Sequence, residues 1–106
     1  MLGSTSSCAI DPIPKLQEIC TRENIWLHVD AAYAGPALLL PEFKELADMM
    51  QEVDSFNFNG HKWMMTGFDC SFLYVKDKQV LINAGKIDAS YITRTAADDV
   101  IDFRDW

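Results

Sequence analysis

Apolar residues recur at helical spacing in two stretches of the chain. The first follows Asp11 and Pro12, which suit a helix start because aspartate accepts hydrogen bonds from free amides and proline fits the first turn. Its apolar face ends near Asn24 and consists of Ile13, Leu16, Ile19 and Cys20. The second stretch covers residues 42–53, after breaks at Pro36 and Pro41, with apolar positions at Phe43, Leu46, Met49, Met50 and Val53. Both patterns predict helices, and residues 79–83 predict one further helical turn.

Three short stretches predict β-strands: the apolar, partly β-branched run at residues 25–29, residues 55–58, and residues 70–75. Continuous apolar runs of this length are typical of strands that are covered on both faces. Because helical stretches alternate with them, the expected fold class is α/β with a mainly parallel sheet. Polar residues follow the first two strands, at Asp30 and at residues 59–62. Ligand sites in such sheets lie beyond the carboxyl ends of the strands, so these residues mark the candidate site.

The remaining parts of the chain predict loops. Residues 3–7 are small and polar, without a glycine-rich phosphate motif, and residues 86–100 are polar with little periodicity. Loops as long as the second are usually functional or disordered. Three covered strands also need helices on both faces of the sheet, and these patterns supply too few of them. We therefore expect an internal piece of a larger domain.

Composition narrows the classes of partner. The chain of 106 residues carries a net charge of −7 and has no basic stripe, which argues against nucleic acid and anionic lipid. Its longest apolar run, residues 36–41, is too short to cross a bilayer, and no secretory signal opens the sequence. Three cysteines without CxxC spacing argue against a disulfide framework or a zinc ribbon. We expect a reducing compartment, and so the cytoplasm.

Two residues that follow the predicted strands have side chains suited to catalysis. Lys62 lies among aromatic and apolar neighbours, and desolvation makes a lysine amine nucleophilic, as Schiff-base chemistry requires. By itself, the same pattern also fits an ordinary surface lysine. Asp30 can cap the turn after its strand, or its carboxylate can hold a pyridinium nitrogen protonated. The residues alone leave both alternatives open.

A metal site is a further alternative. His28 and Asp30 alternate on one side of a strand and His61 follows later, which are the residue types of a facial triad for non-haem iron. Lys62, directly after His61, complicates the open coordination positions that such an iron needs. A histidine in the position of His28, between two apolar strand residues, is more often packed within its strand. We expect no metal at this site.

Five runs of residues occur in a familiar order: GSTSSCA at 3–9, HVDAAYAG at 28–35, DSFNFNGHKW at 54–63, FDCS at 68–71 and DFRDW at 102–106. Together they resemble the group II pyridoxal-phosphate-dependent decarboxylases, which include the aromatic-L-amino-acid and histidine decarboxylases. The likeness covers essentially the whole chain. Several long motifs in order are far more specific than any one of them alone, and they favour the catalytic interpretation of the lysine.

The resemblance implies a pyridoxal 5'-phosphate cofactor, held in part of the large domain of the type I, aspartate-aminotransferase-like fold. Lys62 would carry the internal aldimine, within an active-site lysine segment at residues 54–66, and Asp30 would pair with the pyridine nitrogen. The other implied cofactor contacts are Thr5 at the polar edge of the ring, Ala32 on one ring face, and Asn59 and His61 near the phosphate and the ring. Tyr91, in a mobile catalytic loop at residues 86–100, would protonate the carbanion left by loss of carbon dioxide.

The implied activity is decarboxylation of an aromatic or related L-amino acid by a homodimer, with the mobile loop reaching across the subunit interface. Two departures from the family pattern bear on this expectation. Gly60 stands where relatives usually have proline, so we expect a looser approach to His61 and Lys62. The serine- and glycine-rich phosphate loop and the histidine that stacks on the ring would lie upstream of these residues. A non-catalytic remnant that only associates with full-length partners is therefore the competing expectation.

Overall fold

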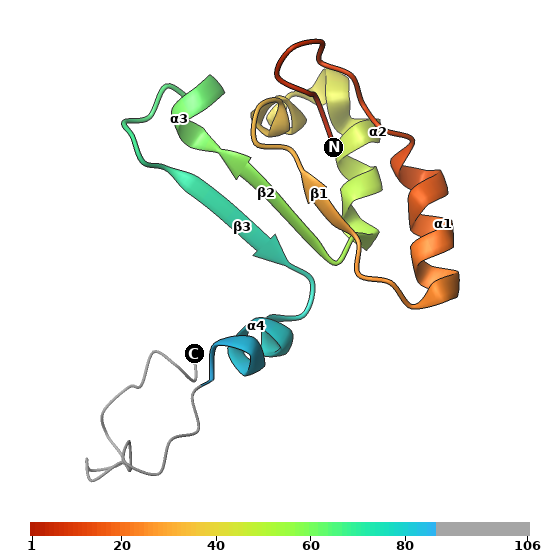
Figure 1. Cartoon of the computed structure of the whole chain (residues 1–106). Helices are drawn as coiled ribbons and strands as arrows, with labels where there is room; N and C mark the ends of the chain where they lie inside the picture. The colour runs from red at the N-terminus through yellow and green to blue at the C-terminus, as the bar shows by residue number, and fades with distance from the viewer. Residues whose placement is uncertain (87–106) are drawn as a thin grey trace, which may run out of the picture. The chain divides into compact units, whose positions relative to one another are not determined.

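The computed structural model describes residues 1–86, which fall into two compact units, one of residues 1–76 and one that begins at Asp77. The first unit holds the helices and strands that matter for the site (Figure 1). They are α1 (Ile13–Glu23), β1 (His28–Asp30), α2 (Lys44–Met49), β2 (Ser55–Asn59), α3 (Gly60–Trp63) and β3 (Ser71–Val75). Single turns of 3-10 helix flank α2, namely η1 (Gly35–Leu39), η2 (Pro41–Phe43) and η3 (Met50–Glu52). The second unit contributes α4 (Lys78–Gly85), which confirms the predicted helical turn there.

Helix α1 confirms the first predicted helix but not its predicted cap. It ends where expected, since Asn24 adopts the left-handed conformation that closes helices (φ 53°, ψ 47°). At the other end, no side chain caps the helix. The carboxylate of Asp11 instead binds the terminal ammonium of Met1 at 2.6 Å. The β-bridge between Leu2 and Ile10 places the ammonium group of Met1 beside Asp11. The ammonium group carries a full positive charge, whereas a backbone amide at the start of a helix carries only a partial charge.

The strand predictions hold for β2 and β3, whereas β1 begins later than predicted. The first apolar run was expected to form a strand from residue 25, but Ile25 and Trp26 are 54% and 47% exposed, and pairing starts only at His28. Residues 42–53 are helical as expected, yet they divide into η2, α2 and η3. In both places, the apolar pattern predicted the type of secondary structure correctly but not its exact boundaries.

The sheet is mixed, so the expected mainly parallel arrangement is wrong for the described strands. Their order is β1-β2-β3, with β1 parallel to β2 and β3 antiparallel to β2. Parallel neighbours need a crossover of a dozen or more residues, usually with a full helix. Between β2 and β3, the chain forms only the four-residue α3 and a turn, so it folds straight back.

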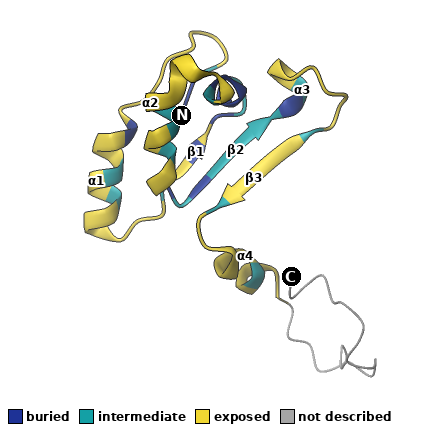
Figure 2. Cartoon of the chain, turned by 180° about the vertical axis from the view of Figure 1, so that it is seen from behind, coloured by how far each residue is buried: buried dark blue, intermediate teal, exposed yellow. Residues whose placement is uncertain are grey.

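The two faces of the sheet differ in character. One face carries Val29, Phe56 and Phe58, and Phe58 stacks on Phe72 of β3 at 4.8 Å between ring centroids. This face packs on the core of the unit, which consists of Leu2, Ile13, Val29, Ala31, Ala34 and Val53. The other face carries polar side chains, namely His28, Asp30, Ser55, Asn57 and Asn59. Figure 2 shows burial concentrated around β1 and β2, while β3 is exposed along most of its length.

Gly35, at the start of η1, is predicted to tolerate no side chain. A Cβ atom there would lie 2.4 Å from Phe58 Cβ, closer than real Cβ atoms approach, and 3.2 Å from Ala31 Cβ, which is a tight contact. Gly35→Ala should therefore lower the free energy of unfolding by about 1–3 kcal/mol, as overpacking of a core does. The matched control is Gly67→Ala, because nothing lies within 4 Å of that position. Equal denaturation midpoints for the two variants would contradict this packing.

No helix within residues 1–86 is both long enough and apolar enough to cross a membrane.

Candidate functional site

β1 and β2 end at the same edge of the sheet (Figure 1), and polar residues lie at these ends. Asp30 is the last residue of β1 and Asn59 the last of β2. The segments beyond them are joined, since the Asn59 amide donates to the Ala32 carbonyl at 3.2 Å. Helix α3 follows β2 directly and carries His61 and Lys62. The fold therefore brings five of the predicted site residues to one edge: Asp30, Ala32, Asn59, His61 and Lys62.

Asp30 serves as the structural cap that was one of its two expected roles. Its Oδ1 atom accepts a hydrogen bond from the Ala32 amide at 2.9 Å, and its backbone carbonyl accepts one from the Leu2 amide at 2.8 Å. The carboxylate is exposed, and among residues 1–86 its second oxygen accepts no hydrogen bond. One oxygen thus holds the turn, and the other can accept from a cationic N–H group. The cap and the functional role are compatible in the same side chain.

His61 is held in one orientation by its neighbours. The Cys70 amide donates to its Nδ1 atom at 3.1 Å, and Phe68 stacks on its ring at 4.5 Å between centroids. A neutral imidazole that accepts at Nδ1 carries its proton at Nε2. The ring therefore presents an N–H donor at Nε2, which suits an anionic group such as a phosphate. Phe68 was not singled out as a site residue from the sequence.

Lys62 is exposed, so the expectation that its apolar neighbours bury it is wrong for the described residues. Helix α3 is a single turn at the edge of the sheet. The neighbouring aromatic side chain, Trp63, contacts Tyr33 edge-to-face, with 5.4 Å between the ring centroids. Nothing in residues 1–86 covers the lysine. Its ammonium group is available at the same edge of the sheet as Asp30.

The loop at residues 3–7 lies against the end of β1, because the Leu2 amide donates to the Asp30 carbonyl. Gly3 is buried with φ +75°, and a Cβ atom there would lie 2.2 Å from Ala34 Cβ, so glycine is required at this close approach. Thr5 is exposed in the turn that follows. Tyr91 and most of the predicted loop at 86–100 lie outside the described residues.

The arrangement does not support the iron site that was the alternative. Both ring nitrogens of His28 are engaged within the sheet, Nδ1 with Ser55 Oγ at 2.7 Å and Nε2 with Asn57 Oδ1 at 3.1 Å. His61 Nδ1 is engaged with the Cys70 amide. Among residues 1–86, no group of three or more His, Cys, Asp and Glu side chains is placed to hold a metal.

Ser55 and Asn57 were also missed as site residues. The alternation of polar and aromatic residues in β2 places them on the polar face with Asn59, and that alternation was visible in the sequence.

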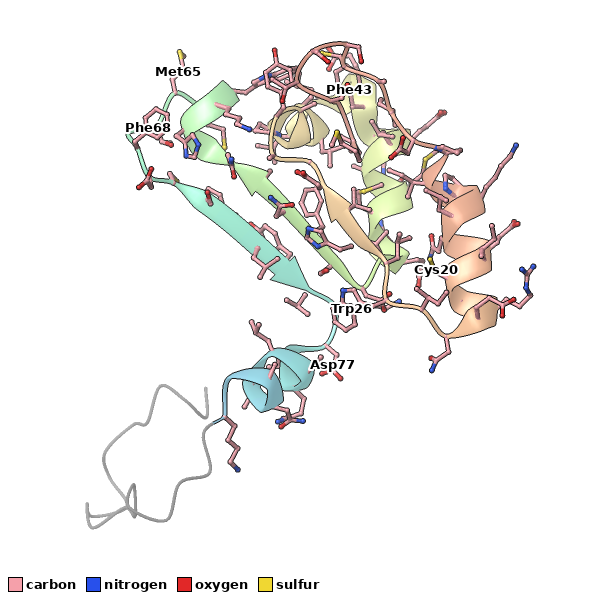
Figure 3. All side chains as sticks on the ribbon, viewed as in Figure 1. Cys20, Trp26, Phe43, Met65, Phe68 and Asp77 are labelled. Carbon is pink, nitrogen blue, oxygen red and sulfur yellow. The ribbon has the colours of Figure 1, made fainter. Side chains whose placement is uncertain are left out.

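A cavity of about 540 Å³ lies at the opposite end of the strands. Its lining includes Cys20 of α1, Trp26 before β1, and Lys76 after β3, which is paired with Glu52 at 2.7 Å. Figure 3 shows Cys20 and Trp26 at this end, and Met65 and Phe68 at the end that carries α3. The cavity is therefore separate from the edge that holds Asp30 and Lys62.

The donor set at the candidate site fits pyridoxal phosphate. A primary amine at Lys62 matches an aldehyde, and the second oxygen of Asp30 matches a protonated ring nitrogen. The Nε2–H group of His61 and the side-chain NH2 group of Asn59 are donors suited to an anionic substituent. The site thus offers one amine, one carboxylate and neutral donors, where a metal would need a cluster of carboxylates, imidazoles or thiolates.

Comparisons with known proteins agree with this chemistry. A family model described as "Pyridoxal-dependent decarboxylase conserved domain" matches residues 1–106. The chain is 45% identical over 107 residues to tryptophan decarboxylase 2 of Oryza sativa subsp. japonica and to the aromatic-L-amino-acid decarboxylase of Cavia porcellus. Each alignment covers 99% of this chain and 22% of the relative. The chain thus spans about a fifth of the length of the curated relatives it matches.

Solved structures give the same picture. The structure of Oryza sativa TDC with PLP and tryptamine matches with a TM-score of 0.81 and 40% identity, covering 98% of this chain and 22% of that one. That of Rhodiola rosea 4-hydroxyphenylacetaldehyde synthase matches with a TM-score of 0.74 and 38% identity, covering 79% and 18%. The described part of the chain, residues 1–86, therefore shares the fold of one part of these larger enzymes.

Proposed function

The chain belongs to the pyridoxal-dependent decarboxylase family, and on that premise we propose that it forms part of the active site of an enzyme that decarboxylates an aromatic L-amino acid. The observation that carries the proposal is the meeting of Asp30 and the Lys62 helix at one sheet edge, within a segment 45% identical to aromatic decarboxylases. Most of such an enzyme would lie outside these residues. The activity is accordingly proposed for an assembly that supplies the remainder, here called the assembled enzyme.

Each residue at the edge has a distinct task in this proposal. When bound, pyridoxal phosphate supplies an electron sink for the electron pair that stays on the substrate's α-carbon when carbon dioxide leaves. Lys62 holds the cofactor covalently through its amine. Asp30 keeps a positive charge on the ring nitrogen with its second oxygen, while its first oxygen keeps the turn closed. His61 donates from Nε2, fixed in that role by the Cys70 amide.

The other residues of the proposed site come from the family likeness. Asn59 donates near the phosphate, Ala32 packs on one face of the ring, and Thr5 lies at its polar edge. Tyr91 returns a proton to the carbon that loses carbon dioxide. We also propose that the assembled enzyme is a homodimer in which the loop at residues 86–100 reaches the partner's site.

The covalent role of Lys62 can be tested by reduction. These 106 residues would replace the matching segment of the Oryza sativa tryptophan decarboxylase, and this chimera would be loaded with pyridoxal phosphate and treated with borohydride. We expect the label in a peptide that contains Lys62, because its amine is exposed at the site edge. Label on Lys76 or Lys86, with Lys62 unmodified, would refute the proposed function. Lys62→Arg, which keeps the charge but forms no stable imine, is the control that should abolish labelling.

A second prediction concerns the proton that Tyr91 donates. Tyr91→Phe in the same chimera keeps the ring and removes the acidic hydroxyl. The reacting carbon would then be exposed to oxygen, so amine product should fall while aldehyde, ammonia and peroxide appear. Product analysis by chromatography and a peroxide assay would measure the switch, with Tyr74→Phe, on β3, as the control. Unchanged amine output from Tyr91→Phe would rule out this role.

A further inference from the structure

A network of hydrogen bonds joins four side chains and runs along the polar face of the sheet toward Asp30. Trp26 Nε1 donates to Ser55 Oγ at 2.8 Å, and Ser55 Oγ lies 2.7 Å from His28 Nδ1. His28 Nε2 lies 3.1 Å from Asn57 Oδ1. Ser55, at the centre, is only 6% exposed. In the register of the two parallel strands, His28 pairs with Ser55 and Asp30 pairs with Asn57. The last residue of the hydrogen-bond network, Asn57, therefore lies directly opposite Asp30.

The direction of each hydrogen bond follows from the chemistry of its ends. An indole nitrogen can only donate, and an amide oxygen can only accept. Ser55 therefore accepts from Trp26, which leaves its own proton for His28 Nδ1. At the other side of the ring, His28 Nε2 must carry a proton to donate to Asn57. One neutral tautomer of His28 satisfies every group in the network.

The anchoring matters because His28 could otherwise reach Asp30. Two residues apart on one face of a strand are separated by about 6.6 Å, a distance that an imidazole and a carboxylate can bridge. The Oδ1 atom of Asp30 is already used by the Ala32 amide, so only its second oxygen can receive the nitrogen of a cofactor ring. An imidazole free to rotate would compete for that oxygen. With both ring nitrogens bound elsewhere, His28 cannot.

We infer that Ser55 and Asn57 hold the His28 ring away from Asp30 and so keep the second carboxylate oxygen free for the ring nitrogen of pyridoxal phosphate. The inference rests on the proposed function. In it, Ser55 is a positioning residue: it touches neither substrate nor cofactor and acts through His28.

A pair of substitutions tests this role in the chimera. Ser55→Ala releases the ring and should raise the dissociation constant for pyridoxal phosphate about tenfold or more, the effect of losing one charge-assisted hydrogen bond. Ser55→Thr keeps the hydroxyl and should bind like the parent. The decisive variant adds His28→Phe to Ser55→Ala, which removes the competing imidazole. The double variant should return to within about threefold of the parent, as expected of sites coupled through one group.

If Ser55 had a purely structural role, adding His28→Phe to Ser55→Ala should not restore cofactor binding. Removing two side chains of the network should weaken binding at least as much as removing one. A double variant no better than Ser55→Ala would therefore overturn the inference. Thermal melting of all variants would show the stability loss separately from cofactor affinity.

A second readout needs no cofactor. Nitrogen NMR of the cofactor-free chimera, labelled in histidine, should show His28 protonated at Nε2 and accepting at Nδ1, and Ser55→Ala should shift the Nδ1 resonance toward that of an unprotonated nitrogen without a hydrogen bond. A ring protonated at Nδ1 in the parent would overturn the inference even in an active enzyme. Failure of the proposed function would instead appear as absent labelling of Lys62, with the His28 tautomer intact.

Discussion

Asp30→Asn should lower the turnover of the assembled enzyme by about 10²–10³-fold, the range found when a preorganised electrostatic contact is removed from an active site. The substitution isolates the charge, because asparagine keeps the oxygen that accepts from the Ala32 amide and so preserves the turn. A neutral amide, however, cannot hold the cofactor nitrogen protonated. Turnover would be measured as amine released from an aromatic amino acid at saturating cofactor.

The control for Asp30→Asn is Asp48→Asn, which removes an exposed carboxylate paired with Lys44 on α2. A surface change of this kind is usually within about 0.5 kcal/mol in stability and should leave turnover unchanged. Asp30→Ala adds the loss of the cap, so it should also lower the melting temperature. If Asp30→Asn turned over like Asp48→Asn, the carboxylate would be a cap and nothing more.

The sequence carried much of the candidate site, because its residues follow strand ends. Asp30 and Asn59 end β1 and β2, and the register of two parallel strands is enough to bring such residues to one edge. The family likeness favoured one of the two roles that the residues alone left open for Lys62, and it supplied the cofactor role expected of His61. By contrast, Ser55 and Asn57 act through hydrogen bonds to His28 on a neighbouring strand. Their importance depends on which strands become neighbours, and local sequence does not record that.

The errors in the predicted fold also arise from contacts between residues that are far apart in the sequence. The strand expected from Ile25 begins at His28 because that residue pairs with Ser55, the first residue of β2. β3 runs antiparallel to β2 because the connection through α3 is too short for a parallel crossover. The spacing of apolar residues does not predict the direction of a strand. Lys62 is exposed because a buried lysine needs covering residues, and the neighbours that contact α3 within residues 1–86 leave its side chain accessible to solvent. In each case, the local pattern identified the residue, and its partners across the fold decided its environment.

The remaining surface of the sheet bears on what a polypeptide of these residues would do alone. Among the strands of residues 1–86, β3 lies at an edge of the sheet. Its sequence SFLYV has no charge and no proline, and Leu73 and Tyr74 are 56% and 55% exposed. Exposed apolar edge strands of this kind pair with other chains. Met65 and Phe68, in the connection before β3, are also highly exposed (Figure 3). A polypeptide of residues 1–106 should therefore associate through these surfaces.

We expect that polypeptide to be catalytically inactive and to bind no pyridoxal phosphate, however well it is kept in solution. Lys62 and Asp30 can hold two points of the cofactor, but among residues 1–86 few donors are placed for its phosphate, and each missing charged hydrogen bond costs about 1.5–3 kcal/mol. Light scattering and absorbance titration with pyridoxal phosphate would measure the two properties separately. Leu73→Lys is the matched variant, because a charge on the edge strand should reduce association without restoring cofactor binding. A monomeric preparation that bound the cofactor stoichiometrically and released carbon dioxide from an aromatic amino acid would contradict this expectation, and would mean that the donors at Asn59 and His61 suffice to hold the phosphate.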